Sequence, residues 1–267
     1  MKPGGERSAD ASSASSVFGD SRGRGVRAPI LCFLSLLVFH LPAAELTEQE
    51  TEGRQFAAQL CSLRPETNST FNGILQIRSK GQRAEIPITG KIVVTESDWR
   101  TTYETHPGTN DQIGESFTVI SNGTNHYEVS QSNAVRQLQP AELFIPFAGS
   151  DFWLVDLGLD FLHWPAQRML KKELRRGQGC GVLESSSGQA DSPAYSRVVS
   201  WVDLDTGGIV HADAYDAHGK RLKEFEPKEF RKINGRWEVQ EMEISNVQTK
   251  SRTTLRFNLN PHPPVEK

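Results

Sequence analysis

Residues 197–215 read RVVSWVDLDTGGIVHADAY, and this stretch decides the fold class. Two runs rich in β-branched and aromatic residues, Arg197 to Asp203 and Ile209 to Tyr215, flank the turn Thr206-Gly207-Gly208. Glycines after a polar residue supply the positive φ angles that tight hairpins need. The stretch therefore predicts a β-hairpin.

Short segments rich in β-branched and aromatic residues, separated by turn residues, continue on both sides of this hairpin. In the last of these strands, Leu255, Phe257 and Leu259 alternate with polar residues, which predicts one buried and one solvated face. Many hairpins in series favour a large antiparallel meander that curls into a barrel or half-barrel. The further strands that we expect cover residues 71–78, 84–95, 99–105, 116–120, 127–129, 220–230 and 253–259.

One helix precedes the strands. Phe56, Leu60 and Leu63 are spaced i, i+4 and i+7 within Glu45 to Arg64, and Pro65 ends the pattern. The expected fold class is therefore mainly β, with an N-terminal helix.

The first 44 residues differ from the rest of the chain. Residues 1–27 are rich in Gly, Ser, Ala and Arg, and they are followed by the apolar stretch Ala28 to Leu41 and by Pro42-Ala43-Ala44. A basic region, an apolar core and small residues are the three parts of a signal peptide. The apolar core is too short to span a bilayer, which takes about 20 residues. We expect cleavage after Ala43 or Ala44, leaving residues 45–267 as one domain outside the cytoplasm.

Two cysteines remain after this cleavage, Cys61 and Cys180. An oxidising compartment lets such cysteines pair, but the sequence leaves a disulfide and two separate thiols equally open. Cys32 lies inside the apolar core of the signal, and no small residue stands just before it as a lipid-modified cysteine would require. We therefore expect a mature protein without a lipid anchor of its own.

Composition and charge narrow the class of function. The chain has 36% hydrophobic and 24% charged residues with a formal net charge of -3, which is typical of an ordinary globular protein. The longest basic run, Lys171 to Arg176, is interrupted by Glu173 and Leu174 and fits a solvated strand face. Nothing here predicts binding to nucleic acid.

One segment breaks the alternating pattern. Residues 143–147 and 152–165 carry large apolar side chains on every side, with charge only at Asp151, Asp156 and Asp160. Residues this apolar must be covered by the rest of the fold, or must themselves cover a cavity.

Five short segments stand in a recognisable order and spacing: Ser150-Asp151-Phe152 with Asp156-Leu157, Trp201-Val202-Asp203, Ala214 to Phe225, Asn234-Gly235-Arg236-Trp237, and Thr249 to Leu255. Together they resemble the LolA-like outer-membrane lipoprotein-sorting proteins, over the chain from about Phe56 to Leu259. The resemblance is closest to the broad, largely uncharacterised branch of that family. No counterpart of the carriers' cavity arginine is found near Trp99-Arg100.

The resemblance implies an incomplete antiparallel barrel, or half-barrel, with a short helical lid and an apolar cavity for acyl chains. It also implies a monomeric periplasmic carrier that takes an acylated lipoprotein or lipid from an inner-membrane transporter to an outer-membrane acceptor. The alternative is an envelope module of structural or interaction type, with a filled half-barrel. The residues expected to line the cavity or form its lid, any of which could instead be ordinary core, are Trp99, Phe152, Trp153, Leu157, Phe161, Trp164 and Trp201.

The chain lacks the common catalytic and metal-binding sequence motifs. There is no Gly-x-Ser-x-Gly elbow and no His-Glu-x-x-His, and no Cys/His cluster has ligand spacing. Of the histidines, His211 falls on a strand face and His218 in a turn, where packed or solvated roles are the rule. We therefore expect neither an enzyme nor a bound metal or cofactor.

Overall fold

The computed structural model describes residues 46–106, 114–131, 134–188, 194–233 and 236–258. The predicted signal peptide lies outside these residues. Among them, no helix has the length and apolar character needed to cross a membrane.

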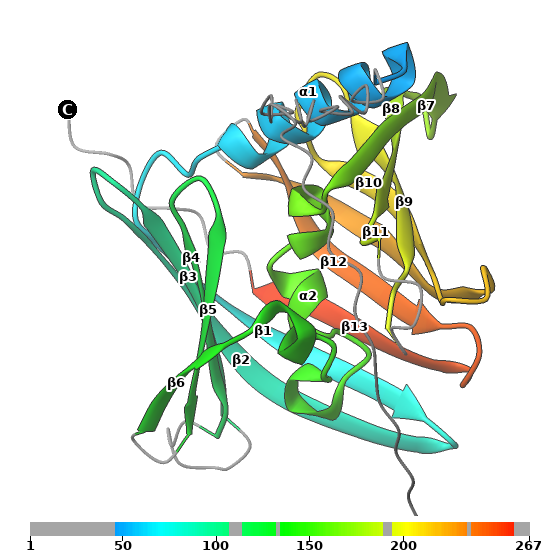
Figure 1. The fold of residues 1–267 in the computed structure, drawn as a ribbon. Helices are drawn as coiled ribbons and strands as arrows, with labels where there is room; N and C mark the ends of the chain where they lie inside the picture. Colours follow the sequence, from blue (N-terminus) through cyan, green and yellow to red (C-terminus); the bar gives the residue numbers. More distant parts are fainter. Residues whose placement is uncertain (1–45, 107–113, 132–133, 189–193, 234–235, 259–267) are drawn as a thin grey trace, which may run out of the picture. The chain divides into compact units, whose positions relative to one another are not determined.

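Thirteen strands of the described chain form a single antiparallel sheet (Figure 1). Its order is β6-β5-β4-β3-β2-β1-β13-β12-β11-β10-β9-β8-β7, so the sheet ends in two edges, β6 and β7, and is not closed into a barrel. The predicted mainly β half-barrel is confirmed. The strands are β1 (Ser69–Ser79), β2 (Gln82–Val94), β3 (Trp99–Thr105), β4 (Ser116–Ser121), β5 (Asn125–Gln131), β6 (Ala134–Leu138), β7 (Ala166–Arg175), β8 (Gln178–Ser186), β9 (Arg197–Asp203), β10 (Ile209–Tyr215), β11 (Arg221–Ile233), β12 (Arg236–Asn246) and β13 (Ser251–Asn258).

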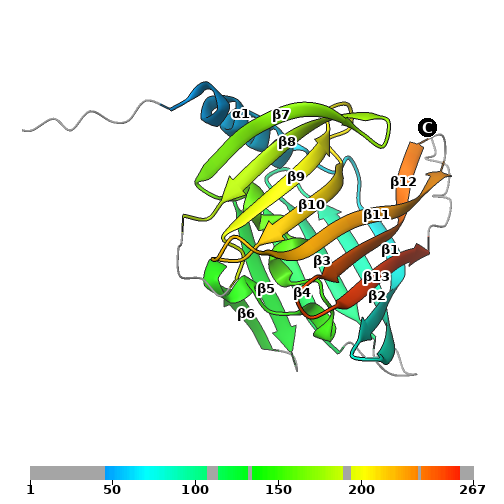
Figure 2. The same cartoon turned by 90° about the vertical axis from the view of Figure 1, so that its right-hand side faces the viewer.

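Almost every neighbouring pair in the sheet is a hairpin of consecutive strands. The exception is the central pair, β1 with β13, which aligns Leu75 with Leu255. Figure 2 shows these two strands side by side in the middle of the curved sheet. The first and last strands of the domain are thus joined at its centre.

The predicted hairpin at residues 197–215 is present with the expected bounds, as β9 and β10. The preceding strand, β8, ends with Ser185 and Ser186. The Ser185 hydroxyl donates to Gln167 on β7, so a buried polar pair stabilises the strand there.

Helix α1 (Glu48–Ser62) begins at a capping box formed by Thr47 and Glu50. It packs against β7, β8 and the short helix η3 (Asp160–His163). The contact with β7 is unusually close, because a Cβ atom at Gly53 would lie only 2.5 Å from the Cα atom of Arg168. Glycine at this position lets the helix lie directly on the strand backbone.

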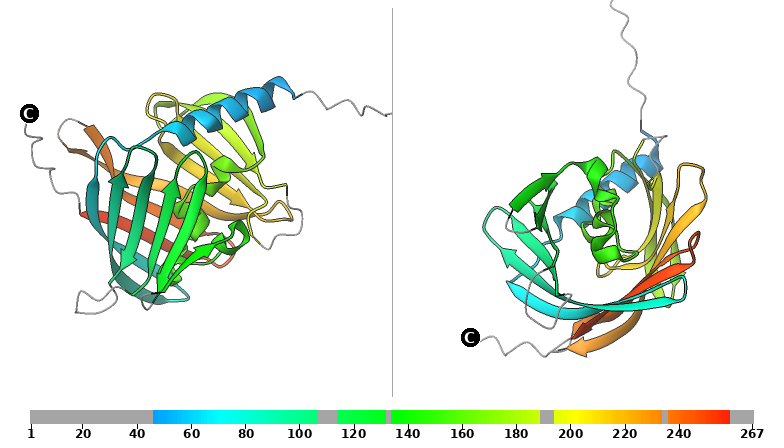
Figure 3. Two further views of the ribbon diagram at one scale, coloured as in Figure 1. Left: turned by 60° about the vertical axis from the view of Figure 1, so that its left-hand side comes forward. Right: turned by 90° about the horizontal axis from the view of Figure 1, so that it is seen from below.

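An inner segment, residues 139–165, connects edge strand β6 to edge strand β7. It contains η1 (Pro140–Leu143), η2 (Phe147–Gly149), α2 (Leu154–Leu157) and η3. The right-hand view of Figure 3 shows these turns enclosed by the curve of the sheet. Leu143, Leu154 and Val155 are fully buried. Most of the apolar residues that broke the alternating pattern therefore pack inside the half-barrel, whereas Ile145 and Leu159 are exposed.

Candidate ligand-binding cavity

A cavity of about 810 Å³ lies between the inner segment and the concave face of the sheet. One end, where β1 begins and β13 ends, carries polar residues such as Ser69, Asn72 and Asn258. The wall is mainly apolar. It includes Phe71, Ile92, Ile209, Ala212, Phe225, Met242, Ile244, Leu255 and Phe257.

The structure separates the predicted lining residues into three groups. Phe152, Leu157 and Phe161 line the cavity. Trp99 instead lines a second, smaller cavity of about 170 Å³, which Leu157 also borders. The other three tryptophans, Trp153, Trp164 and Trp201, are in neither lining.

Trp153 and Trp164 pack beside the cavity as part of the inner segment. The Trp153 ring stacks on Tyr195 with ring centroids 4.9 Å apart. The Trp164 indole N–H donates to the Asp160 carboxylate at 3.1 Å. The Trp164 ring also meets Phe161 edge-on, and both Tyr195 and Phe161 line the cavity, so the two indole rings pack behind its wall.

Trp201 requires a correction, because it points to the opposite face of the sheet. Side chains alternate along β9, and Val198 and Val202 face the core. The Trp201 indole N–H donates to Glu173, and its ring meets His211 edge-on. Trp201 therefore covers the convex face.

A buried lysine that the sequence analysis did not single out faces the cavity. Lys223 on β11 has a side chain only 2% exposed. Its Nζ donates to the Asp151 carbonyl at 2.7 Å and to the Asp156 carboxylate at 3.2 Å, and it lies 3.6 Å from the Trp153 ring centroid. The sequence contains one indication of this. Lys223 and Phe225 are two residues apart on the strand, so both point to the same, apolar face.

Further polar contacts attach the inner segment to the sheet. The Tyr195 hydroxyl donates to Asp156 at 2.9 Å. The pKa of Tyr195 is raised, and burial of the side chain is the main cause. The buried Asp151 carboxylate accepts from Ser251 at 2.5 Å and from Thr253 at 3.0 Å, both on β13. The inner segment is thus held by β11 and β13 through hydrogen bonds to charged groups, which are the stronger kind.

Lys223 makes the stability of the fold depend on pH. Burial lowers the pKa of Lys223 to about 8, and Asp156 opposes this only in part. An unfolded lysine has a pKa near 10.4, so between these values the unfolded chain binds more protons here than the folded chain, and stability rises with pH. Urea titrations of the wild type and of Lys223→Met give the free energy of unfolding of each protein. We expect the difference, wild type minus variant, to rise by up to about 1.4 kcal/mol per pH unit between about pH 8 and 10.4. A difference that does not change with pH would mean an ordinary lysine pKa.

Cys61 and Cys180 are free thiols in the structure. Phe56 of α1 packs where a side chain at Gly181 would point, so the neighbouring Cys180 faces the other side of the sheet. The Cys61 thiol lies 3.8 Å from the Leu162 carbonyl oxygen on the inner side. The disulfide alternative is therefore not the state seen here.

Comparison with known families finds a match over part of the chain. A family model described only as an uncharacterized protein matches residues 129–260. No curated protein matches the chain.

Several solved structures share the fold. A DUF1329 family protein from Desulfovibrio piger has a TM-score of 0.65 at 21% identity, covering 82% of this chain and 96% of that one. A putative outer membrane lipoprotein-sorting protein domain from Vibrio parahaemolyticus has a TM-score of 0.66 at 19% identity, with coverage of 82% and 95%. A LolA superfamily protein from Nitrosomonas europaea has a TM-score of 0.54 at 14% identity, with coverage of 81% and 96%. The chain therefore has the half-barrel fold of DUF1329 and LolA superfamily proteins.

Proposed function

We propose that this protein is a periplasmic carrier that binds the acyl chains of lipoproteins or lipids in the half-barrel and releases them by equilibrium binding, without a covalent step. The observation that carries the proposal is the apolar cavity of about 810 Å³ on the concave face. A half-barrel serving only as a structural module would fill this space with side chains.

The cavity suits an apolar cargo. Its volume falls within the roughly 300–1,000 Å³ of pockets that enclose small organic ligands. Each methylene group buried there contributes about 0.8 kcal/mol, so a long acyl chain gains enough to be held against water. The polar residues at one end, Ser69 and Asn72 among them, suit the point where a chain meets its polar head group.

The proposed route of the cargo follows from the predicted signal peptide and from the fold. A protein exported across the inner membrane that carries acyl chains needs a donor and an acceptor. We propose an inner-membrane transporter as donor and an outer-membrane protein as acceptor. The solved sorting-protein domain from Vibrio parahaemolyticus, which shares the fold, supports this assignment.

The test fills the cavity with a side chain of the protein itself. Met242 on β12 lines the cavity and is partly buried, so Met242→Trp should occupy the space of the cargo. We expect wild-type protein from the periplasm of a Gram-negative host to carry lipid or acylated species in native mass spectrometry. We expect the fraction of Met242→Trp protein that carries lipid to be at least ten-fold lower than that of the wild type.

Val93→Trp is the matched control, because Val93 is 46% exposed on β2 next to Ile92, which lines the cavity, and so faces away from it. This control should carry cargo as the wild type does. A wild-type protein that is free of lipid, and that takes up no acyl ligand when one is supplied, would refute the carrier and favour a structural or interaction module.

A further inference from the structure

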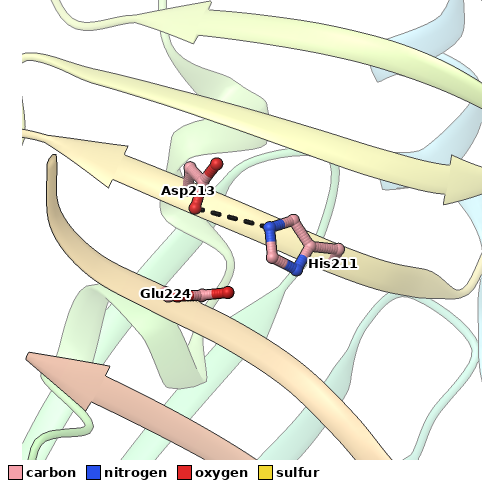
Figure 4. Close-up of side chains that lie close together, drawn as sticks. All are labelled: His211, Asp213 and Glu224. Atoms are coloured by element: carbon pink, nitrogen blue, oxygen red, sulfur yellow. Dashed lines mark ion pairs between the residues drawn. The ribbon is translucent and has the colours of Figure 1, made fainter. Parts of the chain in front are cut away.

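Three side chains meet on the convex face, opposite the cavity. His211 and Asp213 are two residues apart on β10 and therefore point to the same side. Glu224 on β11 is paired directly with Asp213. One nitrogen of His211 and one oxygen of each carboxylate all lie within 4.8 Å of one another. Figure 4 shows the imidazole of His211 directed toward both carboxylates.

The imidazole of His211 is buried and only half satisfied. Its side chain is 4% exposed, and its Nε2 lies 3.4 Å from Asp213 Oδ1. Its Nδ1 is buried and has no hydrogen-bond partner among the residues that the structure describes. The contact with Asp213 thus holds the ring through Nε2, and Nε2 is the nitrogen that faces the two carboxylates.

The two carboxylates create a place for a cation. Like charges directly opposite on neighbouring strands repel each other. The guanidinium of Arg221 partly offsets the repulsion between the two carboxylates, because it lies 3.3 Å from Asp213 and 3.7 Å from Glu224. The Arg221 side chain is 46% exposed, so it can turn into solvent and leave the carboxylates to another cation.

We propose that His211, Asp213 and Glu224 bind a divalent transition-metal ion, with Zn²⁺ as the best match. One imidazole and two carboxylates are ligands that Zn²⁺ accepts, and a water molecule completes four-coordination. The Trp201 ring on β9 packs edge-on against the imidazole of His211, with ring centroids 5.0 Å apart, and holds it in place. The bound ion cross-links β10 and β11 on the outside, behind the strands that carry Ala212, Phe225 and Lys223 to the cavity wall.

Titration of the metal-stripped full chain tests the site. We expect isothermal titration with Zn²⁺ to show one bound ion per chain, and Co²⁺ to give the visible absorption of a low-coordinate site. Glu224→Gln should weaken Zn²⁺ binding at least ten-fold, and its partial exposure makes it safe for folding. Arg221→Gln should tighten binding, because it removes the cation that competes with the metal.

Glu229→Gln is the matched control, an exposed glutamate on the same strand, and it should bind Zn²⁺ as the wild type does. His211→Ala should abolish binding, with circular dichroism checking that the chain remains folded. The proposal fails if the wild type takes up no Zn²⁺, or if Glu224→Gln binds it as tightly as Glu229→Gln. It also fails if Arg221→Gln lowers the melting temperature with no gain in affinity, since the cluster would then be only an ion-pair network.

Discussion

Replacement of Lys223 by methionine is expected to lower the free energy of unfolding by about 3–5 kcal/mol at neutral pH. Methionine has a similar length but no N–H donors, so the loss is mainly that of the hydrogen bonds to Asp151 and Asp156, which a neutral lysine amine at high pH would keep. Lys223 Nζ lies 3.2 Å from Asp156, whose carboxylate is largely buried, and it also donates to the Asp151 carbonyl. Without this group, the largely buried Asp156 carboxylate loses a hydrogen-bond donor. Urea unfolding monitored by circular dichroism measures the effect.

The double variant Lys223→Met with Asp156→Asn separates the charge from the packing. Because it removes both charges together, it should recover most of the stability lost in the single variant. Arg256→Gln serves as the exposed control, because Arg256 pairs with Glu241 at 2.7 Å with its side chain 52% exposed, and such surface pairs contribute about 0–1 kcal/mol. Equal losses for Lys223→Met and Arg256→Gln would mean that the buried pair does not hold the inner segment.

Gly53→Val is expected to detach α1 from the sheet and to lower stability by about 1–3 kcal/mol. A Cβ atom at Gly53 would lie 2.5 Å from the Cα atom of Arg168, and a strand backbone cannot move aside as a flexible side chain can. The helix also buries Ala57 and Leu60 in the core, so lifting it exposes apolar surface. Hydrogen exchange should show faster exchange over α1, and a hydrophobic fluorescent dye should bind more strongly.

Gln55→Val is the matched control on the same helix, because Gln55 is exposed. It introduces the same β-branched residue without a clash and should change stability by less than about 0.5 kcal/mol. If Gly53→Val behaved like Gln55→Val, the close approach of α1 to β7 would not be part of the stable fold.

The sequence predicted the fold well where side-chain alternation and turn residues coincide. At β9 and β10 the expected bounds agree with the structure, because Gly207 and Gly208 mark the turn. For α1 the expected helix, Glu45 to Arg64, is longer than the observed one, Glu48–Ser62, because the capping box at Thr47 sets the start. Strand β6, with mostly exposed residues, has little apolar alternation to reveal it.

The site was harder to predict, because tertiary packing decides which face of a strand is concave. Aromatic character singled out Phe152 and Phe161, which line the cavity, but also Trp201, which lies on the other face. Lys223 was missed because a charged residue is usually assigned to the solvated face. Its burial depends on Asp156 and Asp151, which lie far from it in sequence.

The central pairing of β1 with β13 has a consequence for how the chain folds. All other strand pairs in the described sheet join consecutive strands, which close shorter loops and form faster. The central pair joins Leu75 to Leu255 and must close a loop of almost the whole domain, which is entropically costly and slow. During folding, two separate stacks of hairpins can therefore form first. Leu255 and Phe257 of β13 line the cavity, so the binding space is completed only when β13 has paired with β1.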